Sequence, residues 1–320
     1  EDGKNFYSQL PRKAYASQDG LCCVDTLHRV TVTGLEKNTT YFYRVLSQEV
    51  KELLPYRPVL GNIVSTDIWK EPLTFTTLDG RQETLSMVMI NDIHGKNDLQ
   101  KKLLEMAPPQ NVDMVVFCGD MCNYINKQSD IFTGFLDTSV GLFASRKPFV
   151  YVRGNHEIRG AYARNFSRYL AGPEGKFYYA FTYGPIRFIV LDSGEDKPDT
   201  DVEYSGLVDF DNYILEQKEW LARELESPEF RAASFRVVLS HIPFGKGGWY
   251  GSERLRKQLL PLLESVRIDL MLSGHNHAFG FMDKGKVTAF PIIVNSNNSV
   301  LTMFGSVSYT HLTLPTTERV

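Results

Sequence analysis

Five of the six apolar runs between residues 85 and 272 are followed at once by a short motif of aspartate, asparagine or histidine. The runs are rich in β-branched residues and have the continuous apolar character of strands that are buried on both faces of a sheet. They alternate with helical periods, which is typical of a sheet with crossover helices. The runs that we assign to strands are Leu85–Ile90, Met114–Cys118, Phe149–Val152, Ile186–Leu191, Phe235–Leu239 and Leu270–Leu272.

Three helices are expected between these strands. Pro261 falls inside the last of them and predicts a kink there, because proline removes a helical hydrogen bond. In the middle helix, the side chains expected on one apolar face are those of Leu215, Trp220, Leu221 and Leu225. The helical ranges are Leu99–Met106, Ile214–Leu225 and Arg254–Val266.

Residues 1–79 predict a separate, β-rich domain. Apolar and polar residues alternate over His28–Val32 and over Tyr41–Val45, with a turn at Gly34–Asn38 between them, and Pro72–Thr77 is another short β-rich run. An immunoglobulin-like sandwich needs about 100 residues and seven strands. We therefore expect a truncated small β-sandwich, followed by an α/β domain over residues 80–305.

Residues 306–317 resemble a translated sequencing adapter of the transposon type. We therefore interpret residues 306–320 as an artefactual tail and leave them out of fold reasoning. On that interpretation the natural chain is cut off near Gly305 and His311 has no function; the alternative is an ordinary polar tail. The sequence opens at Glu1, so the lack of a signal-peptide pattern carries little weight.

Composition excludes several classes of function. The net charge of −3 offers no basic surface for nucleic acid, and no apolar run has the length of a transmembrane helix. The four cysteines are too few for a disulfide scaffold and lack the spacing of a structural zinc site, so we interpret them as buried or free thiols.

The motifs after the strands place similar metal-binding groups at strand ends, where open α/β sheets bind their ligands. Five of the seven histidines lie in these motifs. A mixture of carboxylates and imidazoles suits Fe, Mn or Zn. The motifs are Asn91–Gly95, Gly119–Asn123, Gly154–Glu157, Ser240–His241 and Ser273–His277.

We expect two metal sites that share the bridging carboxylate of Asp120. The other ligands would be Asp92, His94 and His277 at the first site, and Asn155, His241 and His275 at the second. Two cations about 3.5–4 Å apart can activate water and clamp both oxygens of an in-line displacement at phosphorus. His156 follows Asn155 directly and is expected to assist the leaving group.

Each motif also has a structural interpretation when it is taken alone. An isolated aspartate after a strand caps a helix more often than it binds a metal, an isolated histidine is more often a satisfied core residue, and Asn155 could occupy a turn. The five motifs together, in order and each at a strand end, favour the metal-binding interpretation over the structural one.

Three neighbouring residues have two open interpretations each. Asn123 could position the substrate or only fix its loop. Arg159 could contact a phosphate oxygen or lie in solvent. Glu157 could orient His156 or brace the loop through backbone N–H groups.

The motif set resembles that of the calcineurin-like metallophosphoesterase superfamily over about residues 83–300. The resemblance rests on Asp92-x-His94, Gly119-Asp120-x-x-Asn123, Gly154-Asn155-His156-Glu157, Ser240-His241 and Gly274-His275-x-His277. It implies a four-layer αββα sandwich and a dinuclear metal centre.

The N-terminal part, from Val32 to Val45, resembles the fibronectin-III-like domain of purple acid phosphatases. This second resemblance implies export to a periplasm or to the cell exterior. Purple acid phosphatases, however, have a tyrosine ligand where this chain has Asn123, with Tyr124 one residue late, and they lack the histidine that His94 supplies. A ferric-tyrosinate centre is therefore not expected. We expect two divalent or mixed-valence metal ions instead.

These observations predict a metal-dependent phosphoesterase in which metal-bound hydroxide attacks phosphorus. The expected substrate is a small-molecule phosphate monoester or diester, in a pocket rimmed by the loops Asp196–Tyr213 and Phe244–Ser252. The alternative is an exported, non-catalytic binding module on the same scaffold. The motifs specify neither the substrate nor the oligomeric state.

Overall fold

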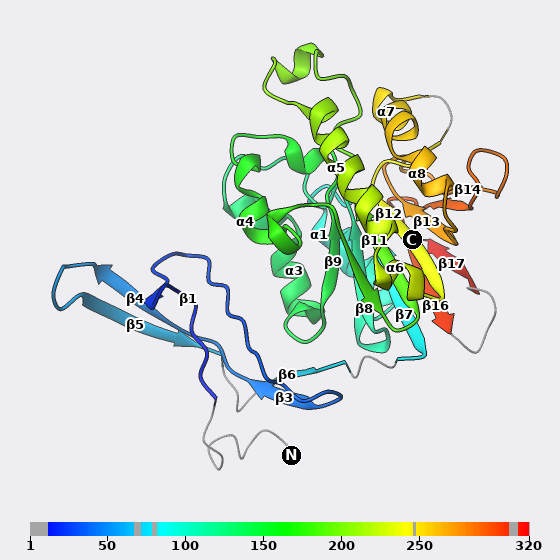
Figure 1. Ribbon diagram of the computed structural model, residues 1–320. Coiled ribbons are helices and arrows are strands. Elements are labelled where there is room, and N and C mark those ends of the chain that lie inside the picture. The colour runs from blue at the N-terminus through cyan, green and yellow to red at the C-terminus, as the bar shows by residue number, and fades with distance from the viewer. Residues whose placement is uncertain (1–11, 67–71, 79–81, 246–247, 307–312, 320) are drawn as a thin grey trace. The chain divides into compact units, whose positions relative to one another are not determined.

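The computed structural model describes residues 12–66, 72–78, 82–245, 248–306 and 313–319. The chain divides into two compact units, Glu1–Arg81 and Gln82–Val320 (Figure 1). None of the helices in the described ranges combines the length and the apolar character that crossing a membrane requires.

In the first unit, the described strands pair only two at a time. The pairs are antiparallel: β1 with β2, β3 with β6, and β4 with β5. None of the described residues of this unit is buried, so the small sandwich stays a prediction. The strands are β1 (Ser17–Gln18), β2 (Leu21–Cys22), β3 (Thr40–Tyr43), β4 (Leu46–Glu52), β5 (Val59–Ser65) and β6 (Leu73–Thr76).

Two of the three β segments predicted here are confirmed, because Tyr41–Val45 overlaps β3 and Pro72–Thr77 contains β6. The strand predicted over His28–Val32 is wrong. Those residues are irregular, and all five are exposed even though apolar and polar residues alternate along them. Alternation indicates a strand only where a partner strand or a core takes up the apolar face.

The second unit contains two sheets whose central strands are parallel. One sheet has the order β17-β16-β7-β8-β9, with β7, β8 and β9 parallel. The other has the order β10-β11-β12-β13-β15-β14, with antiparallel strands only at its two edges. The strands are β7 (Thr84–Ile90), β8 (Met114–Cys118), β9 (Phe149–Val152), β10 (Tyr179–Tyr183), β11 (Ile186–Leu191), β12 (Phe235–Ser240), β13 (Leu270–Ser273), β14 (Gly280–Met282), β15 (Ile292–Val294), β16 (Ser299–Ser306) and β17 (Thr313–Arg319).

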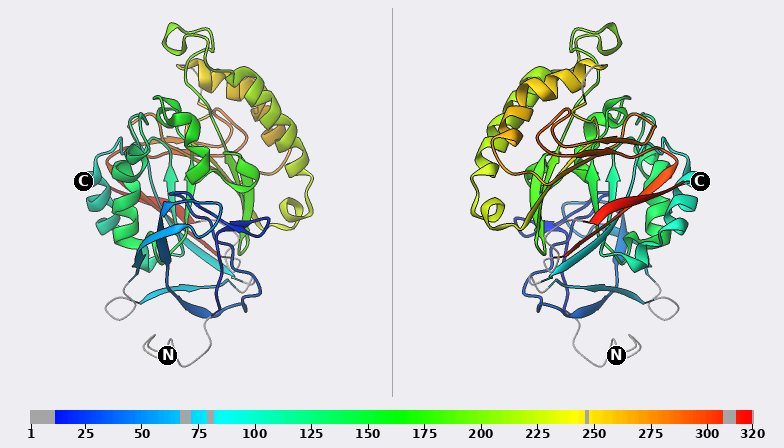
Figure 2. Two further views of the ribbon diagram at one scale, coloured as in Figure 1. Left: turned by 90° about the vertical axis from the view of Figure 1, so that its left-hand side faces the viewer. Right: turned by 90° about the vertical axis from the view of Figure 1, so that its right-hand side faces the viewer.

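Each sheet is buried on both faces, as the continuous apolar runs predict. In β7, Met87 and Met89 enter a core shared with strands of the other sheet, such as Phe188 of β11, whereas Val88 and Ile90 face the helices on the outer side. A third cluster lies between the second sheet and its own helices. Figure 2 shows the helices on opposite sides of the paired sheets. The predicted four-layer αββα arrangement is confirmed.

The helices of the first layer are short and partly of π type, whereas the second layer contains the longest helix. On the side of β7–β9 lie α1 (Asn97–Met106), α2 (Ser129–Ile131), η2 (Phe132–Leu136), α3 (Asp137–Ser139), η3 (Val140–Ala144) and α4 (Ser167–Leu170). On the other side lie α5 (Phe210–Leu225), α6 (Pro228–Ala232), α7 (Tyr250–Gln258) and α8 (Leu260–Glu264). Single 3₁₀ turns are η1 (Pro109–Asn111), η4 (His156–Ile158), η5 (Ala163–Asn165), η6 (Pro173–Gly175) and η7 (Val202–Tyr204).

The interruption predicted at Pro261 is confirmed, because the helical segment divides into α7 and α8 and Pro261 stands in the first turn of α8. A proline fits there without losing an internal hydrogen bond. In α5, Leu221 and Leu225 are buried as predicted, but Leu215 is 43% exposed. The buried stripe runs through Ile214, one residue earlier, so the predicted position of Leu215 on the apolar face is wrong.

The last described residues form β17, which pairs antiparallel with β16. The sequence interpretation left this segment outside the fold, whereas the structure extends a sheet with it. That residues 306–320 are artefactual stays a prediction.

Helix α5 provides a matched pair of substitutions. Leu221→Ala should lower the free energy of unfolding by about 2–5 kcal/mol, because it leaves a cavity in the core. Leu215→Ala on the same helix should change it by less than about 0.5 kcal/mol. Urea denaturation of both variants checks this, and equal losses would contradict the assigned buried face.

Candidate metal centre

The side chains predicted as metal ligands come from both sheets and meet at one edge. Asp92, Asp120 and Asn155 follow the carboxyl ends of β7, β8 and β9. His241 and His275 follow β12 and β13 of the other sheet. Because parallel strands in a sheet end at the same edge, two stacked sheets can supply ligands to one centre from opposite sides.

The first cluster consists of Asp92, His94 and His277. The Nε2 atom of His277 lies 3.1 Å from Asp92 Oδ1 and 3.1 Å from the Nε2 atom of His94. His94 Nε2 is 3.9 Å from Asp92 Oδ1. Two imidazole nitrogens and a carboxylate oxygen at these separations are spaced to bind one cation.

The second cluster consists of Asp120, His241 and His275. His241 Nε2 lies 3.1 Å from Asp120 Oδ2, and the rings of His241 and His275 meet edge to face, with centroids 5.3 Å apart. Asn155, predicted as a fourth member, is 1% exposed.

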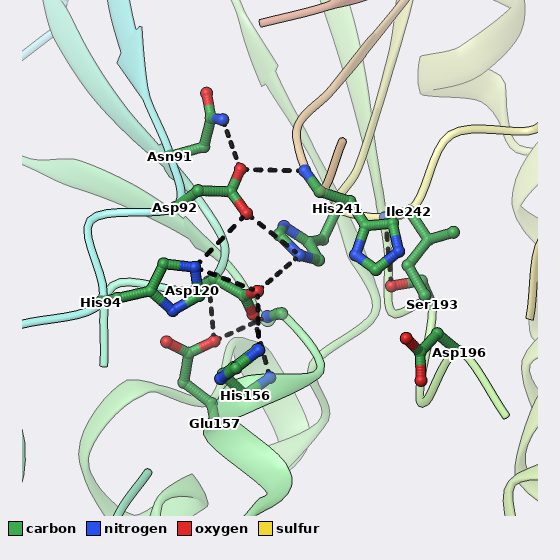
Figure 3. Close-up of polar contacts among 12 residues, drawn as sticks. Asn91, Asp92, His94, Asp120, His156, Glu157, Ser193, Asp196, His241 and Ile242 are labelled. Atoms are coloured by element: carbon green, nitrogen blue, oxygen red, sulfur yellow. Dashed lines mark hydrogen bonds and ion pairs between the residues drawn. The ribbon is translucent and has the colours of Figure 1, made fainter. Parts of the chain in front are cut away.

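Asp120 faces both clusters (Figure 3). Its Oδ2 atom lies 4.0 Å from His94 Nε2 on one side and 3.1 Å from His241 Nε2 on the other. Its Oδ1 atom accepts a hydrogen bond from the backbone N–H of His156. One oxygen is therefore held by the protein, and the other is directed between the two groups of ligands, as a bridging carboxylate requires.

Unsatisfied buried atoms test whether this group fits metal ions. Asp92 Oδ1, Asn155 Oδ1 and His275 Nε2 are inaccessible to solvent and form no hydrogen bond. Buried polar groups of this kind are costly unless they find a partner. All three belong to the predicted ligand set, and their chemistry suits Fe, Mn or Zn. The residues therefore fit a pair of cations.

The pKa values of the imidazoles differ because their charged neighbours differ. Burial lowers the pKa of His241, but the carboxylates of Asp120 and Asp92 outweigh it and raise the value to about 10. Burial lowers the pKa of His94 and of His275 to about 4. The hydrogen bond to Asp92 also raises the pKa of His277. Without a metal, protonation of His241 is thus favoured beside Asp120, and that of His277 beside Asp92.

The backbone of the ligand loops is unusual. Asp92, His94, Asp120, His275 and His277 all have φ between 51° and 71°, a left-handed conformation that is uncommon outside glycine. The loops after β7 and β8 are joined by Asp92 N–H to Gly119 O (3.0 Å) and by His94 N–H to Asp120 O (2.9 Å). A side chain at Gly119 would lie 2.3 Å from the His241 ring, so only glycine allows this approach.

Glu157 braces the loops, which was one of its two predicted roles. It is fully buried and accepts hydrogen bonds from the backbone N–H groups of Asp120, Cys122 and Gly154, each 2.9 Å long. Burial, together with the nearby charge of Asp120, raises the pKa of Glu157 to about 7. One carboxylate therefore ties the loop after β8 to the loop after β9.

His156 forms a third group of potential metal-holding side chains with His94 and Asp120, and its ring meets that of His94 edge to face, with centroids 4.5 Å apart. Its Nδ1 atom lies 2.8 Å from the carbonyl oxygen of Asn123, and its Nε2 atom lies 3.9 Å from Asp120 Oδ2. Asn123 therefore contributes its backbone carbonyl to the site. Tyr124, one residue later, is 54% exposed.

Arg159 is neither a free surface residue nor an unpaired anion-binding group. Its Nε and Nη2 atoms donate to the two carboxylate oxygens of Glu195, at 3.1 Å each, and Nη2 lies 3.8 Å from Asp196. The remaining nitrogen, Nη1, is 3.4 Å from His156 Nε2. Sequence reasoning missed Glu195, which is 1% exposed and lies in a loop without a motif.

Both loops predicted to rim the pocket reach the centre. The first contributes Asp196 beside Arg159. The second contributes Trp249, which is 49% exposed and lies edge to face against the predicted ligand His275, with ring centroids 5.9 Å apart.

The profile of the family described as calcineurin-like phosphoesterase matches residues 85–279. The chain belongs to this family. The match contains all seven side chains of the predicted ligand set, His156 and both sheets up to β13. Membership of this family supports metal-dependent hydrolysis of phosphate esters as the general class of reaction. It also supports a dinuclear metal centre.

The chain is also similar to plant purple acid phosphatases. It is 24% identical to purple acid phosphatase 23 of Arabidopsis thaliana, over 87% of this chain and 62% of that protein. It is 24% identical to purple acid phosphatase 1 of Ipomoea batatas, over 83% of this chain and 54% of that protein. The chain thus spans less than two thirds of the length of these relatives.

Among solved structures, a dimetal phosphatase from Danio rerio aligns with a TM-score of 0.49 and 16% identity. The alignment covers 73% of this chain and 98% of that one.

The raised pKa of His241 has a consequence for metal binding. A ligand imidazole must be neutral at its coordinating atom, so a cation that binds at about pH 7.5 should displace roughly one proton from His241. The apparent affinity for the cation should rise with pH, because a larger fraction of His241 is then deprotonated. The rise should be up to about tenfold for each pH unit below pH 10. His94 and His275 are already neutral at this pH and release none.

Calorimetric titration of metal-free protein with Mn(II), in buffers of different ionisation enthalpy, measures the number of protons released. A binding heat that does not depend on the buffer would mean that His241 is neutral before the metal arrives.

Proposed function

We propose that this protein hydrolyses phosphate esters at a two-metal centre, with His156 assisting the departing oxygen. The observation that carries the proposal is the position of Asp120, whose Oδ2 atom lies between the two clusters of ligand side chains. A pair of divalent cations held there would supply a Lewis acid and an activated water at neutral pH. The ligand set is complete, which disfavours a non-catalytic binding module.

The hydrogen bond of His156 selects its tautomer. A carbonyl oxygen only accepts, so the Nδ1 atom facing Asn123 carries the proton. The Nε2 atom is then the end of the ring that faces Asp120 and the ligand clusters. When His156 is an imidazolium, this end can donate a proton to the leaving oxygen of the substrate.

Arg159 would contribute separately, as a donor to the phosphoryl group, through the geometry of its guanidinium. Glu195 engages two of its nitrogens, which leaves Nη1 directed at the His156 ring. A donor held in this way can contact a phosphoryl oxygen without first losing side-chain freedom. Glu195 thus acts through Arg159, as a positioning residue.

The remaining features of the activity rest on the family. The metal pair is Fe, Mn or Zn, in agreement with the mixed carboxylate and imidazole ligands. The substrate is a small-molecule monoester or diester, and the protein is exported, as the resemblance to purple acid phosphatases implies.

The role of His156 is tested with leaving groups of different basicity. His156→Asn should lower kcat by about 10²–10⁴-fold on an alkyl phosphate. The loss should be smaller on p-nitrophenyl phosphate, because p-nitrophenolate departs without a proton. Turnover of both esters, and of bis(p-nitrophenyl) phosphate, is measured on Mn(II)- or Zn(II)-loaded protein.

His28→Asn is the matched control, because His28 is an exposed histidine of the first unit and the variant should keep full turnover. Equal losses on the two monoesters would contradict proton donation by His156. No turnover of any ester by wild-type protein with two bound metals would contradict the proposed function itself.

A further inference from the structure

The carboxylate of Asp92 has two oxygens in different surroundings. Oδ2 accepts a hydrogen bond from the side-chain amide of Asn91, at 2.5 Å, and another from the backbone N–H of His275, at 2.9 Å. Oδ1 forms no hydrogen bond and faces His277 Nε2 at 3.1 Å. The protein therefore saturates one oxygen and leaves the other for the cluster (Figure 3).

The amide of Asn91 is held in turn by Asn295. Asn295 Nδ2 donates to Asn91 Oδ1 at 2.7 Å, and Asn91 Nδ2 also contacts the carbonyl oxygen of Asn295 at 3.2 Å. Both side chains are fully buried. Because a carboxylate can only accept, the NH₂ group of Asn91 must face Asp92, and the donor from Asn295 holds it in that orientation.

Ser299 completes the chain of contacts. Its hydroxyl donates to Asn295 Oδ1 at 2.7 Å, and its carbonyl accepts from Asn295 Nδ2 at 3.0 Å. Every polar atom of the Asn295 amide is thus used. A buried network of this kind is stable only when all of its members are satisfied.

The network joins the two sheets at the edge where the ligands emerge. Asn91 follows β7 and Ser299 begins β16 in one sheet, whereas Asn295 follows β15 in the other. The ligand loop after β13 approaches the same point, and a side chain at Gly274 would lie 2.8 Å from both Asn91 Nδ2 and Asp92 Oδ2. The space behind Asp92 is therefore filled by these amides and by backbone.

We propose that Asn91 and Asn295 are positioning residues that fix the Asp92 carboxylate, so that Oδ1 alone faces the metal position shared with His94 and His277. The inference rests on the proposed two-metal centre. Neither amide is a proposed metal ligand: Asn91 donates to Asp92 directly, and Asn295 acts through Asn91. Partners that orient a ligand in this way typically contribute 10–100-fold to metal affinity.

Asn91→Leu tests the proposal, because it removes the amide and keeps a side chain of similar size. The matched control is Gln100→Leu on α1. Gln100 is also fully buried, and its amide also donates two hydrogen bonds, to Phe135 O and to Ser139 Oγ, neither of which belongs to the predicted ligand set. Both variants lose a buried amide, and only the first should change metal binding.

The measurement is Mn(II) binding to the metal-free full chain, followed by the EPR signal of free Mn(II). Wild type and Gln100→Leu should each bind two ions, and the affinity for each ion should be the same in the two proteins. Asn91→Leu should bind one of the two ions about 10–100-fold more weakly, while the other affinity changes less. A folded Asn91→Leu variant with both wild-type affinities would overturn the proposal.

Two further variants keep the result decisive. In the double variant Asn91→Leu/Asn295→Leu, affinity should fall no further than in Asn91→Leu, because the two amides act as one unit; additive losses would contradict this. If Asn91→Leu does not fold, Ser299→Ala should weaken the same ion to a smaller degree, and unchanged binding would then overturn the proposal. Wild-type protein that binds none of Mn(II), Zn(II) and Fe(II) would instead refute the metal centre.

Discussion

Two buried carboxylates, those of Asp92 and Asp120, lie among five imidazoles, and the rest of the second unit is arranged to hold them there. A buried charge is costly unless it is paired and hydrogen-bonded. The protein meets part of this cost with N–H donors, which reach one oxygen of each carboxylate. The other oxygen of each faces the histidines. One oxygen of each carboxylate is therefore hydrogen-bonded by the protein, and the other is available to a cation.

The supporting groups lie in two places. On one side, Glu157 ties together the loops after β8 and β9 through three backbone N–H groups. On the other, Asn91 and Asn295 join the loop after β7 to the opposite sheet. Since each sheet supplies proposed ligands, the spacing of the clusters depends on how firmly the two sheets are joined at this edge. The apolar core between the sheets sets their distance, and the buried polar groups set the orientation of individual side chains.

Much of this arrangement could be predicted from the sequence. Long apolar runs predicted six strands closely, and the motifs after them predicted which side chains would meet. Asn295 was missed because β15 has only three residues, too few for a periodic signal, although an asparagine follows its apolar triplet. Glu195 was missed because its partner Arg159 is distant in sequence. In the first unit, alternation alone predicted a strand over His28–Val32, and none of the described strands pairs with those residues. Local sequence patterns predict local structure well. They contain little information about hydrogen bonds between polar side chains that are distant in the sequence.

The left-handed backbone of five of the proposed ligands has a consequence for how this site can be dissected. Aspartate, asparagine and histidine are the non-glycine residues that best tolerate such a conformation, so the chemistry and the geometry of these turns select the same residue types. An alanine at Asp120 would therefore change two properties at once: it would remove the carboxylate and also strain the turn. Asparagine at that position keeps the backbone preference and removes only the charge. Substitutions that respect the turn separate the contribution of the ligand from that of the loop that presents it.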